Sequence, residues 1–268
     1  MKIDLISDLH IDHWDPKIKS LFAIGEVKNY PLNLGKETDR SKILIVAGDI
    51  CDELNQSIDY LDHISQYYDK VLYVDGNHEH IKQYPELYSS NYIHEQILSK
   101  KNPKLVYLTK ENYIFNNTCF VGCNGWWNYS TGKFDHLDYF DTISSEARIE
   151  PKMIKQFHQN VKTKAEKEAL TLHNNIAQCY KNKDIHNIVV VTHTVPINIF
   201  LNPKDTDLEV NTLFDDIKRC TKITHWLFGH FHEEINKSSK NIEYISNPRG
   251  RPSDNNKILY CSKNVLVS

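Results

Sequence analysis

The sequence predicts an α/β fold in which a β-sheet lies between layers of helix. Three observations support this prediction: short runs rich in Ile, Val and Leu, helical spacing between them, and the absence of any linker or repeat that divides the chain. Nearly continuous hydrophobicity is typical of strands buried on both faces. Five runs have this character: Lys2–Ser7, Ile43–Ala47, Val71–Val74, Ile188–Thr192 and His225–Phe228.

Two segments have the spacing of amphipathic helices. Asp52–Asp69 repeats apolar residues every three or four positions between the second and third runs, which predicts a β–α–β unit. Glu150–Lys183 is the longest helical stretch, with Lys and Glu residues on the opposite face. The predicted buried face of this long helix consists of Val161, Ala165, Ala169, Leu172 and Ile176.

The remaining segments predict short strands. Asn112–Cys123 alternates enough to be a strand or a hairpin arm, with Asn116-Asn117 as the expected turn. The tail predicts a run of short strands over Ile242–Ser246, Lys257–Cys261 and Asn264–Val267.

We expect a single domain over residues 1–268, with irregular insertions near 20–39 and 126–149.

Composition limits the class of protein. With 40% hydrophobic and 25% charged residues, a net charge of −3 and no long basic block, the chain gives no reason to expect a dedicated nucleic-acid-binding patch. No run approaches the roughly 20 apolar residues that span a bilayer. Asp4 and Asp8 would interrupt the apolar core of a signal peptide, and the six cysteines lack CxxC spacing. We therefore expect a cytoplasmic protein with reduced thiols and no membrane partner.

Each of the five apolar runs is followed by residues that can bind a metal or move a proton. In open α/β sheets the ligand site lies just beyond the carboxyl ends of the strands, so we expect these side chains to converge. They are Asp8 and His10, Asp49, Asn77 and His78, His193, and His230 and His232.

The donor types favour a pair of divalent cations. Oxygen and imidazole donors without a suitably placed cysteine favour Mn²⁺, Fe, Zn²⁺ or Ni²⁺ over a thiolate zinc site. Seven donors (two Asp, four His and one Asn) are too many for one tetrahedral ion and fit two ions that share a carboxylate. Such pairs, roughly 3.5–4 Å apart, hydrolyse phosphate esters. Gly48, Gly76 and Gly229 each precede a donor and allow the backbone to come close to the metals.

Taken in order, these motifs resemble the signature of the calcineurin-like metallophosphoesterases. The resemblance extends over residues 8–232, and SNPRG (Ser246–Gly250) resembles an element of some bacterial and phage members. It implies a four-layer α-β-β-α sandwich of mixed sheets flanked by helices. The matching motifs are DxH (Asp8, His10), GD (Gly48-Asp49), GNHE (Gly76–Glu79), a lone His193 after a strand, and GHxH (Gly229–His232).

The resemblance also implies a role for each matching residue. By this resemblance the first metal is bound by Asp8, His10, Asp49 and His232, and the second by Asp49, which bridges, with Asn77, His193 and His230. His78 corresponds to the catalytic histidine, which protonates the leaving oxygen or stabilises phosphoryl charge while a metal-bridging hydroxide attacks in line. Thr192 replaces the Gly that some members have before the lone histidine, and we expect Glu79 to brace a neighbour through a hydrogen bond.

The expected activity is that of a dinuclear metal-dependent phosphoesterase, with Mn²⁺ as the cation that supports it in vitro. Ser/Thr phosphatases carry GDxxDRG after the second strand, whereas this chain has Glu53 at the position of the arginine, which argues against a phosphoprotein substrate. We expect a phosphodiesterase acting on a nucleotide-type substrate. A phosphomonoesterase acting on a small phosphate ester is the alternative, and a non-catalytic scaffold or a nuclease that needs a partner is less favoured.

Three further residues are candidates for substrate binding. Arg249 and Arg251 could bind a phosphate bidentately, although a solvent-facing turn would explain them equally well. Trp126, beside Trp127, could stack on a base, although packing over the edge of a core is the alternative.

Overall fold

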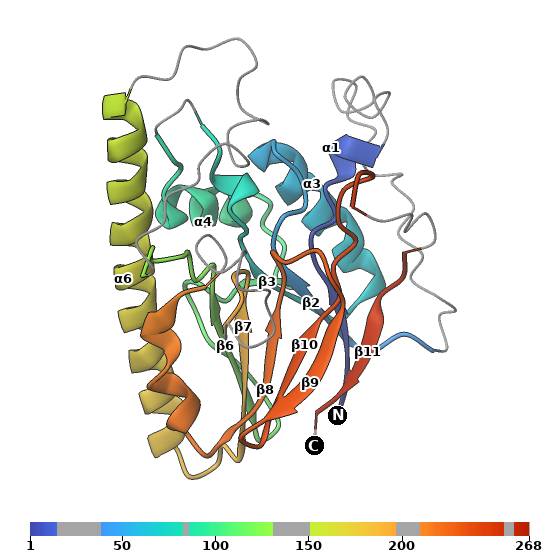
Figure 1. Ribbon diagram of the computed structural model, residues 1–268. Helices are drawn as coiled ribbons and strands as arrows, with labels where there is room; N and C mark the ends of the chain where they lie inside the picture. The colour runs from blue at the N-terminus through green and yellow to red at the C-terminus, as the bar shows by residue number, and fades with distance from the viewer. Residues whose placement is uncertain (15–38, 83–85, 131–150, 197–209, 255–259, 268) are drawn as a thin grey trace.

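The computed structural model describes residues 1–14, 39–82, 86–130, 151–196, 210–254 and 260–267. In these ranges two β-sheets pack against each other, and helices cover their outer faces (Figure 1). The strand order is β11-β1-β2-β3-β4 in the first sheet and β5-β6-β7-β8-β10-β9 in the second. Both sheets are mixed, so the expected α-β-β-α sandwich is confirmed.

The first sheet has a parallel centre. Strands β1 to β4 run parallel to one another, and β11 pairs with β1 in the antiparallel direction. Its outer face packs against α3 (Leu54–Ile64) and α4 (Ser90–Ser99), which contribute residues such as Ile58, Leu61 and Ile93 to a buried cluster. The strands are β1 (Lys2–Ile6), β2 (Ile43–Ala47), β3 (Lys70–Val74), β4 (Leu105–Tyr107) and β11 (Lys263–Leu266).

The second sheet is parallel from β6 to β10, and its two edge strands are antiparallel to their neighbours. A two-residue turn at Asn116-Asn117 joins the first two strands, as predicted, and Asn116 adopts a φ of 55°. The strands are β5 (Tyr113–Phe115), β6 (Thr118–Cys123), β7 (Asn187–Thr192), β8 (Ile223–Phe228), β9 (Ile235–Ser239) and β10 (Ile242–Ser246).

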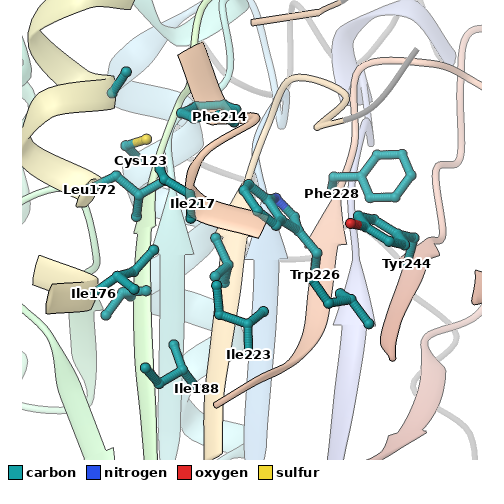
Figure 2. Close-up of a cluster of buried hydrophobic side chains, with 14 of the residues drawn as sticks. Cys123, Leu172, Ile176, Ile188, Phe214, Ile217, Ile223, Trp226, Phe228 and Tyr244 are labelled. Carbon is teal, nitrogen blue, oxygen red and sulfur yellow. The ribbon is translucent and has the colours of Figure 1, made fainter. Parts of the chain in front are cut away.

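A long helix, α6 (Pro151–Lys181), covers the outer face of the second sheet. All five residues of its predicted apolar face are buried, because their spacing keeps them on one side of the helix. Figure 2 shows Leu172 and Ile176 of this helix facing the same core as Trp226 of β8. Phe214 and Ile217 enter that core from the short 3₁₀-helices η6 (Thr212–Phe214) and η7 (Ile217–Arg219).

The third core lies between the two sheets. Because successive side chains of a strand point to opposite faces, Ile3 and Leu5 of β1 are in the same buried cluster as Val189 and Val191 of β7. Each sheet is therefore covered by helices on one face and by the other sheet on the opposite face. This explains the nearly continuous apolar runs, since both faces of the central strands are buried.

Some expectations fall on parts of the chain that are not described. The predicted insertions near 20–39 and 126–149 lie largely in residues 15–38 and 131–150, and Lys257–Cys261 lies mostly in residues 255–259, all outside the described ranges. In the ranges that the structure describes, no helix is long and apolar enough to cross a membrane. The remaining short elements are α1 (Ile11–Trp14), η3 (Ser65–Tyr67) and η4 (His78–His80).

Candidate metal centre and active site

The carboxylate of Asp49 lies at the centre of a histidine cluster at the carboxyl ends of the strands. Its Oδ2 atom is 3.2 Å from Nε2 of His193, and 3.8 Å from Nε2 of both His10 and His78. Asp49 follows β2 of the first sheet, and His193 follows β7 of the second. The cluster therefore lies where the two sheets meet, and the side chain of Asp49 is almost completely buried.

On one side of Asp49, three predicted donors form a group. Nε2 of His10 is 3.1 Å from Nε2 of His232, which is itself 3.7 Å from Oδ1 of Asp8. Among the described residues, Oδ2 of Asp8 is buried without a hydrogen-bond partner. Two facing imidazole nitrogens and an unsatisfied carboxylate oxygen form an acceptor-rich site, which is what a divalent cation requires.

On the other side, His193 and His230 form a group with Asp49 in which one ligand atom from each lies within 4.8 Å of the others. Nδ1 of His193 donates to the backbone oxygen of Ala47 at 2.8 Å, so in the neutral ring Nε2 is an acceptor. That Nε2 is 3.0 Å from Oδ1 of Asn77. Acceptors that converge in this way fit a shared cation.

The electrostatics of the cluster follow from burial and from these close contacts. Burial raises the pKa of Asp8, because it disfavours the charged carboxylate. Burial also lowers the pKa of His10 well below its usual value, and neutral imidazole is the form that binds a metal. Burial alone would lower the pKa of His193 as well, but the nearby Asp49 carboxylate raises it to about 10. Asp49 thus attracts positive charge, whether proton or metal.

His78 lies between a carboxylate and a guanidinium. Its Nδ1 is 2.6 Å from Oδ1 of Asp52, and its Nε2 is 3.1 Å from Nη2 of Arg251. Burial opposes ionisation of His78, but the carboxylates of Asp49 and Asp52 raise its pKa to about 9. Asp52 therefore fixes the orientation of the ring and leaves Nε2 facing the cluster.

Glu79 holds the loops that carry the donors, and it is not among the residues grouped at the candidate metal sites. Its carboxylate accepts from the backbone N–H groups of Asp49, Ile50 and Gly76, at 3.0, 2.6 and 2.7 Å. A Cβ atom on Gly76 would come within 2.0 Å of Oδ1 of Asp49, so a close approach requires glycine there.

The backbone itself is strained at four of the predicted donors. Asp8, His10, Asp49 and His230 have φ angles of 50°, 39°, 54° and 69°, at positive values that cost free energy for residues other than glycine. Strain of this kind concentrates at functional sites, where the surrounding structure holds it in place.

The substrate-binding candidates separate into two groups. Arg251 reaches the cluster through His78, whereas the guanidinium of Arg249 lies 4.1 Å from the ring centroid of Trp14 and is mostly buried. Trp126 requires a correction, because its side chain is fully buried against His80, with 5.1 Å between ring centroids. A completely buried indole is not placed to stack on a base.

Trp127 is the tryptophan that contacts the cluster. Its ring stacks on the imidazole of His230 at an interplanar angle of 14°, with 5.4 Å between centroids. With 1% of its surface exposed, Trp127 shields His230 from water. It supports the candidate metal centre and is not a platform for substrate.

The comparison with protein families agrees with this geometry. The family model described as calcineurin-like phosphoesterase matches residues 1–234. The chain belongs to this family. It is therefore a metal-dependent phosphoesterase. The family implies divalent metal ions, for which the His and Asp groups described above are possible sites.

Three proteins to which this phosphoesterase is similar are distant from it in sequence. An uncharacterized protein, L509, of Acanthamoeba polyphaga mimivirus is 25% identical over 244 residues, which cover 85% of this chain and 83% of that protein. The crystal structure of phosphopantetheinyl hydrolase from Mycobacterium tuberculosis has a TM-score of 0.67 at 16% identity, covering 100% of this chain and 96% of the other. A dimetal phosphatase from Danio rerio has a TM-score of 0.50 at 13% identity, covering 92% and 86%. At these identities the two structures show the shared fold.

Sequence reasoning missed several residues at the site of this phosphoesterase. Asp52 lies three residues after Asp49, and that spacing was a signal, since it places a second carboxylate at the same strand end. His13 was not among the predicted site residues, yet its Nε2 is 3.5 Å from Oδ2 of Asp52. Asp254, which contacts Nδ1 of His232, gave no sequence signal, because it lies in a turn without periodicity.

Proposed function

We propose that this phosphoesterase uses a dinuclear metal centre to hydrolyse a phosphodiester of nucleotide type. The observation that carries the proposal is the central position of Asp49, which approaches donors on both sides. Seven donors are too many for one tetrahedral ion, and a carboxylate that bridges two ions accounts for all of them. The proposed ligands are Asp8, His10, Asp49 and His232 for one ion, and Asp49, Asn77, His193 and His230 for the other.

The proposed cations are Mn²⁺, Fe, Zn²⁺ or Ni²⁺, with Mn²⁺ supporting activity in vitro. Facing donors support such a pair, because one cation can share their lone pairs. Nε2 of His10 is 3.1 Å from Nε2 of His232, and Nε2 of His193 is 3.0 Å from Oδ1 of Asn77. When bound, the two ions lower the pKa of water and neutralise negative charge on the phosphoryl group.

His78 is the proposed general acid. Asp52 accepts the proton of Nδ1 and so directs Nε2 towards the cluster, where it delivers a proton to the leaving oxygen. Arg251 contacts that same Nε2, which supports a role for its guanidinium in binding the reacting phosphate. In the proposed complex, phosphoryl oxygens replace His78 as the acceptors for Arg251.

Charge supports a diester over a monoester. A phosphodiester carries one negative charge, whereas a monoester carries nearly two at neutral pH. In the described ranges Arg251 brings one guanidinium to His78, and Arg249 is turned onto Trp14. The alternative is a phosphomonoesterase for small molecules, which is consistent with a structural neighbour described as a dimetal phosphatase. A non-catalytic scaffold is less favoured, because every donor of the motif is present.

The test compares bis-p-nitrophenyl phosphate with p-nitrophenyl phosphate in the presence of Mn²⁺, Ni²⁺, Zn²⁺ or Mg²⁺ after removal of bound metal. We expect faster turnover of the diester, and the highest rate with Mn²⁺. Faster turnover of the monoester would replace the diester proposal with its alternative. No turnover of either substrate with any of the four ions would favour the scaffold.

A further inference from the structure

A turn near the C-terminal end of the described chain lies against the candidate metal centre. The N–H of Gly250 donates to the backbone oxygen of Asp8 at 3.0 Å, and the oxygen of Gly250 accepts from the indole N–H of Trp14 at 2.9 Å. The N–H of Asp254 donates to the oxygen of Arg251 at 3.0 Å. This 250–254 turn is therefore fixed to the strand end that carries Asp8.

Asp254 connects this turn to His232, one of the proposed metal ligands. Its Oδ2 accepts from Nδ1 of His232 and, at 2.7 Å, from the backbone N–H of Arg251. Because the carboxylate takes the proton of Nδ1, the lone pair of His232 is at Nε2. That atom faces Oδ1 of Asp8 at 3.7 Å and Nε2 of His10 at 3.1 Å.

We propose that Asp254 is a positioning residue for one of the two metal ions. It fixes the tautomer and ring orientation of His232, and so raises the affinity of the site formed by Asp8, His10 and His232 for a divalent cation. The inference rests on the proposed dinuclear function and extends it to a residue outside the family motifs. Loss of a carboxylate that accepts from the second nitrogen of a ligating histidine typically lowers metal affinity by about 10–100-fold.

The two halves of the centre differ in what orients their histidines. His193 donates Nδ1 to the backbone oxygen of Ala47, and its side chain is completely buried. The side chain of His232 is 21% exposed, and its partner Asp254 is 29% exposed, so packing alone does not fix the ring. Loss of Asp254 is therefore expected to affect one half of the centre and leave the other half intact.

The experiment is a calorimetric titration of the metal-free full chain with Mn²⁺. We compare the wild type with Asp254→Asn, which keeps the size of the side chain and removes its charge. Asp69→Asn is the matched control, because Asp69 is 70% exposed and pairs with Lys42 at 3.9 Å, in the loop before β3. Thermal unfolding of each metal-free variant is measured in parallel.

We expect two binding steps in the wild type and in Asp69→Asn. In Asp254→Asn one step becomes 10–100-fold weaker, the other is unchanged, and the melting temperature of the metal-free protein stays that of the wild type. Two unchanged steps in Asp254→Asn would overturn the inference and leave the proposed function intact. A fall in the metal-free melting temperature with both steps weakened equally would also overturn it, because the role would then be structural. A wild type that binds no Mn²⁺ would overturn both.

Discussion

Oδ2 of Asp49 and Nε2 of His193 lie 3.2 Å apart, although one residue follows a strand of the first sheet and the other a strand of the second. The contact spans the line where the two sheets meet. Both side chains are buried, so the attraction between them is poorly screened by water. The geometry of the candidate metal centre therefore depends on how the two sheets pack against each other.

The central position of Asp49 predicts that both cations depend on it. In Asp49→Asn the amide nitrogen replaces one carboxylate oxygen, so the bridge is lost and the two ions lose a shared negative charge. We expect metal content after dialysis to fall from about two Mn²⁺ per chain to nearly none. Elemental analysis provides the measurement, with Asp215→Asn, an exposed aspartate, as control. Retention of one ion would show that Asp49 does not bridge.

His78 is expected to act on turnover and not on metal content. His78→Asn removes the group that delivers the proton while leaving the proposed ligands in place, so the rate should fall by about 10²–10⁴-fold. The measurement is kcat for bis-p-nitrophenyl phosphate beside the Mn²⁺ stoichiometry. His173→Asn, at an exposed position of α6, is the control. Full activity of the His78→Asn variant would show that His78 is not the general acid.

The main strands and the convergence of the donors could be predicted from the sequence, because both follow from local pattern. A strand buried on both faces is nearly continuous in hydrophobicity, and parallel strands bring their carboxyl ends to one edge. The edge strand β9 was not predicted, since its sequence INKSS has one buried residue and an otherwise largely exposed polar surface. Neither was α4, in which Ile93 and Ile97 are buried but Tyr92 and Leu98 are exposed.

The supporting contacts were harder to predict, because they depend on how loops fold back. Trp126 and Trp127 are adjacent in sequence, yet one packs on His80 and the other on His230. The sequence does not reveal which indole points to the cluster. Likewise the contact between Arg251 and His78 spans 173 residues, and nothing in the SNPRGRP segment indicates its direction.

Arg251 is expected to contribute to substrate binding. Arg251→Gln removes a charge-assisted hydrogen bond to phosphate, which is worth about 1.5–3 kcal/mol in kcat/KM. We expect much of this loss to appear as a raised KM for bis-p-nitrophenyl phosphate, with two Mn²⁺ still bound. Arg219→Gln is the matched control, because the side chain of Arg219 is 84% exposed on η7. Equal KM values in the two variants would exclude Arg251 from the binding site.

A buried carboxyl on α6 is expected to give the protein a pH-dependent stability that is separate from the candidate metal centre. Glu168 accepts from the N–H of Gly125 at 2.9 Å and is 7% exposed. Burial, and then the nearby charge of Asp75, raise the pKa of Glu168 to about 7, although Lys164 and Lys110 oppose the shift. The folded state therefore binds this proton more tightly than the unfolded state, in which the pKa is the ordinary 4.5.

The sign of the effect follows from that difference. The stability contributed by protonated Glu168 is fully present below pH 4.5 and is lost as the pH rises through about 7. Glu168→Gln keeps a neutral acceptor for Gly125 at every pH. The free energy of unfolding of this variant, relative to that of the wild type, should therefore rise by about 2–3 kcal/mol between pH 4.5 and pH 8. Urea unfolding of the metal-free proteins across this range measures the difference. A difference that stays constant with pH would show that Glu168 has the same pKa in both states.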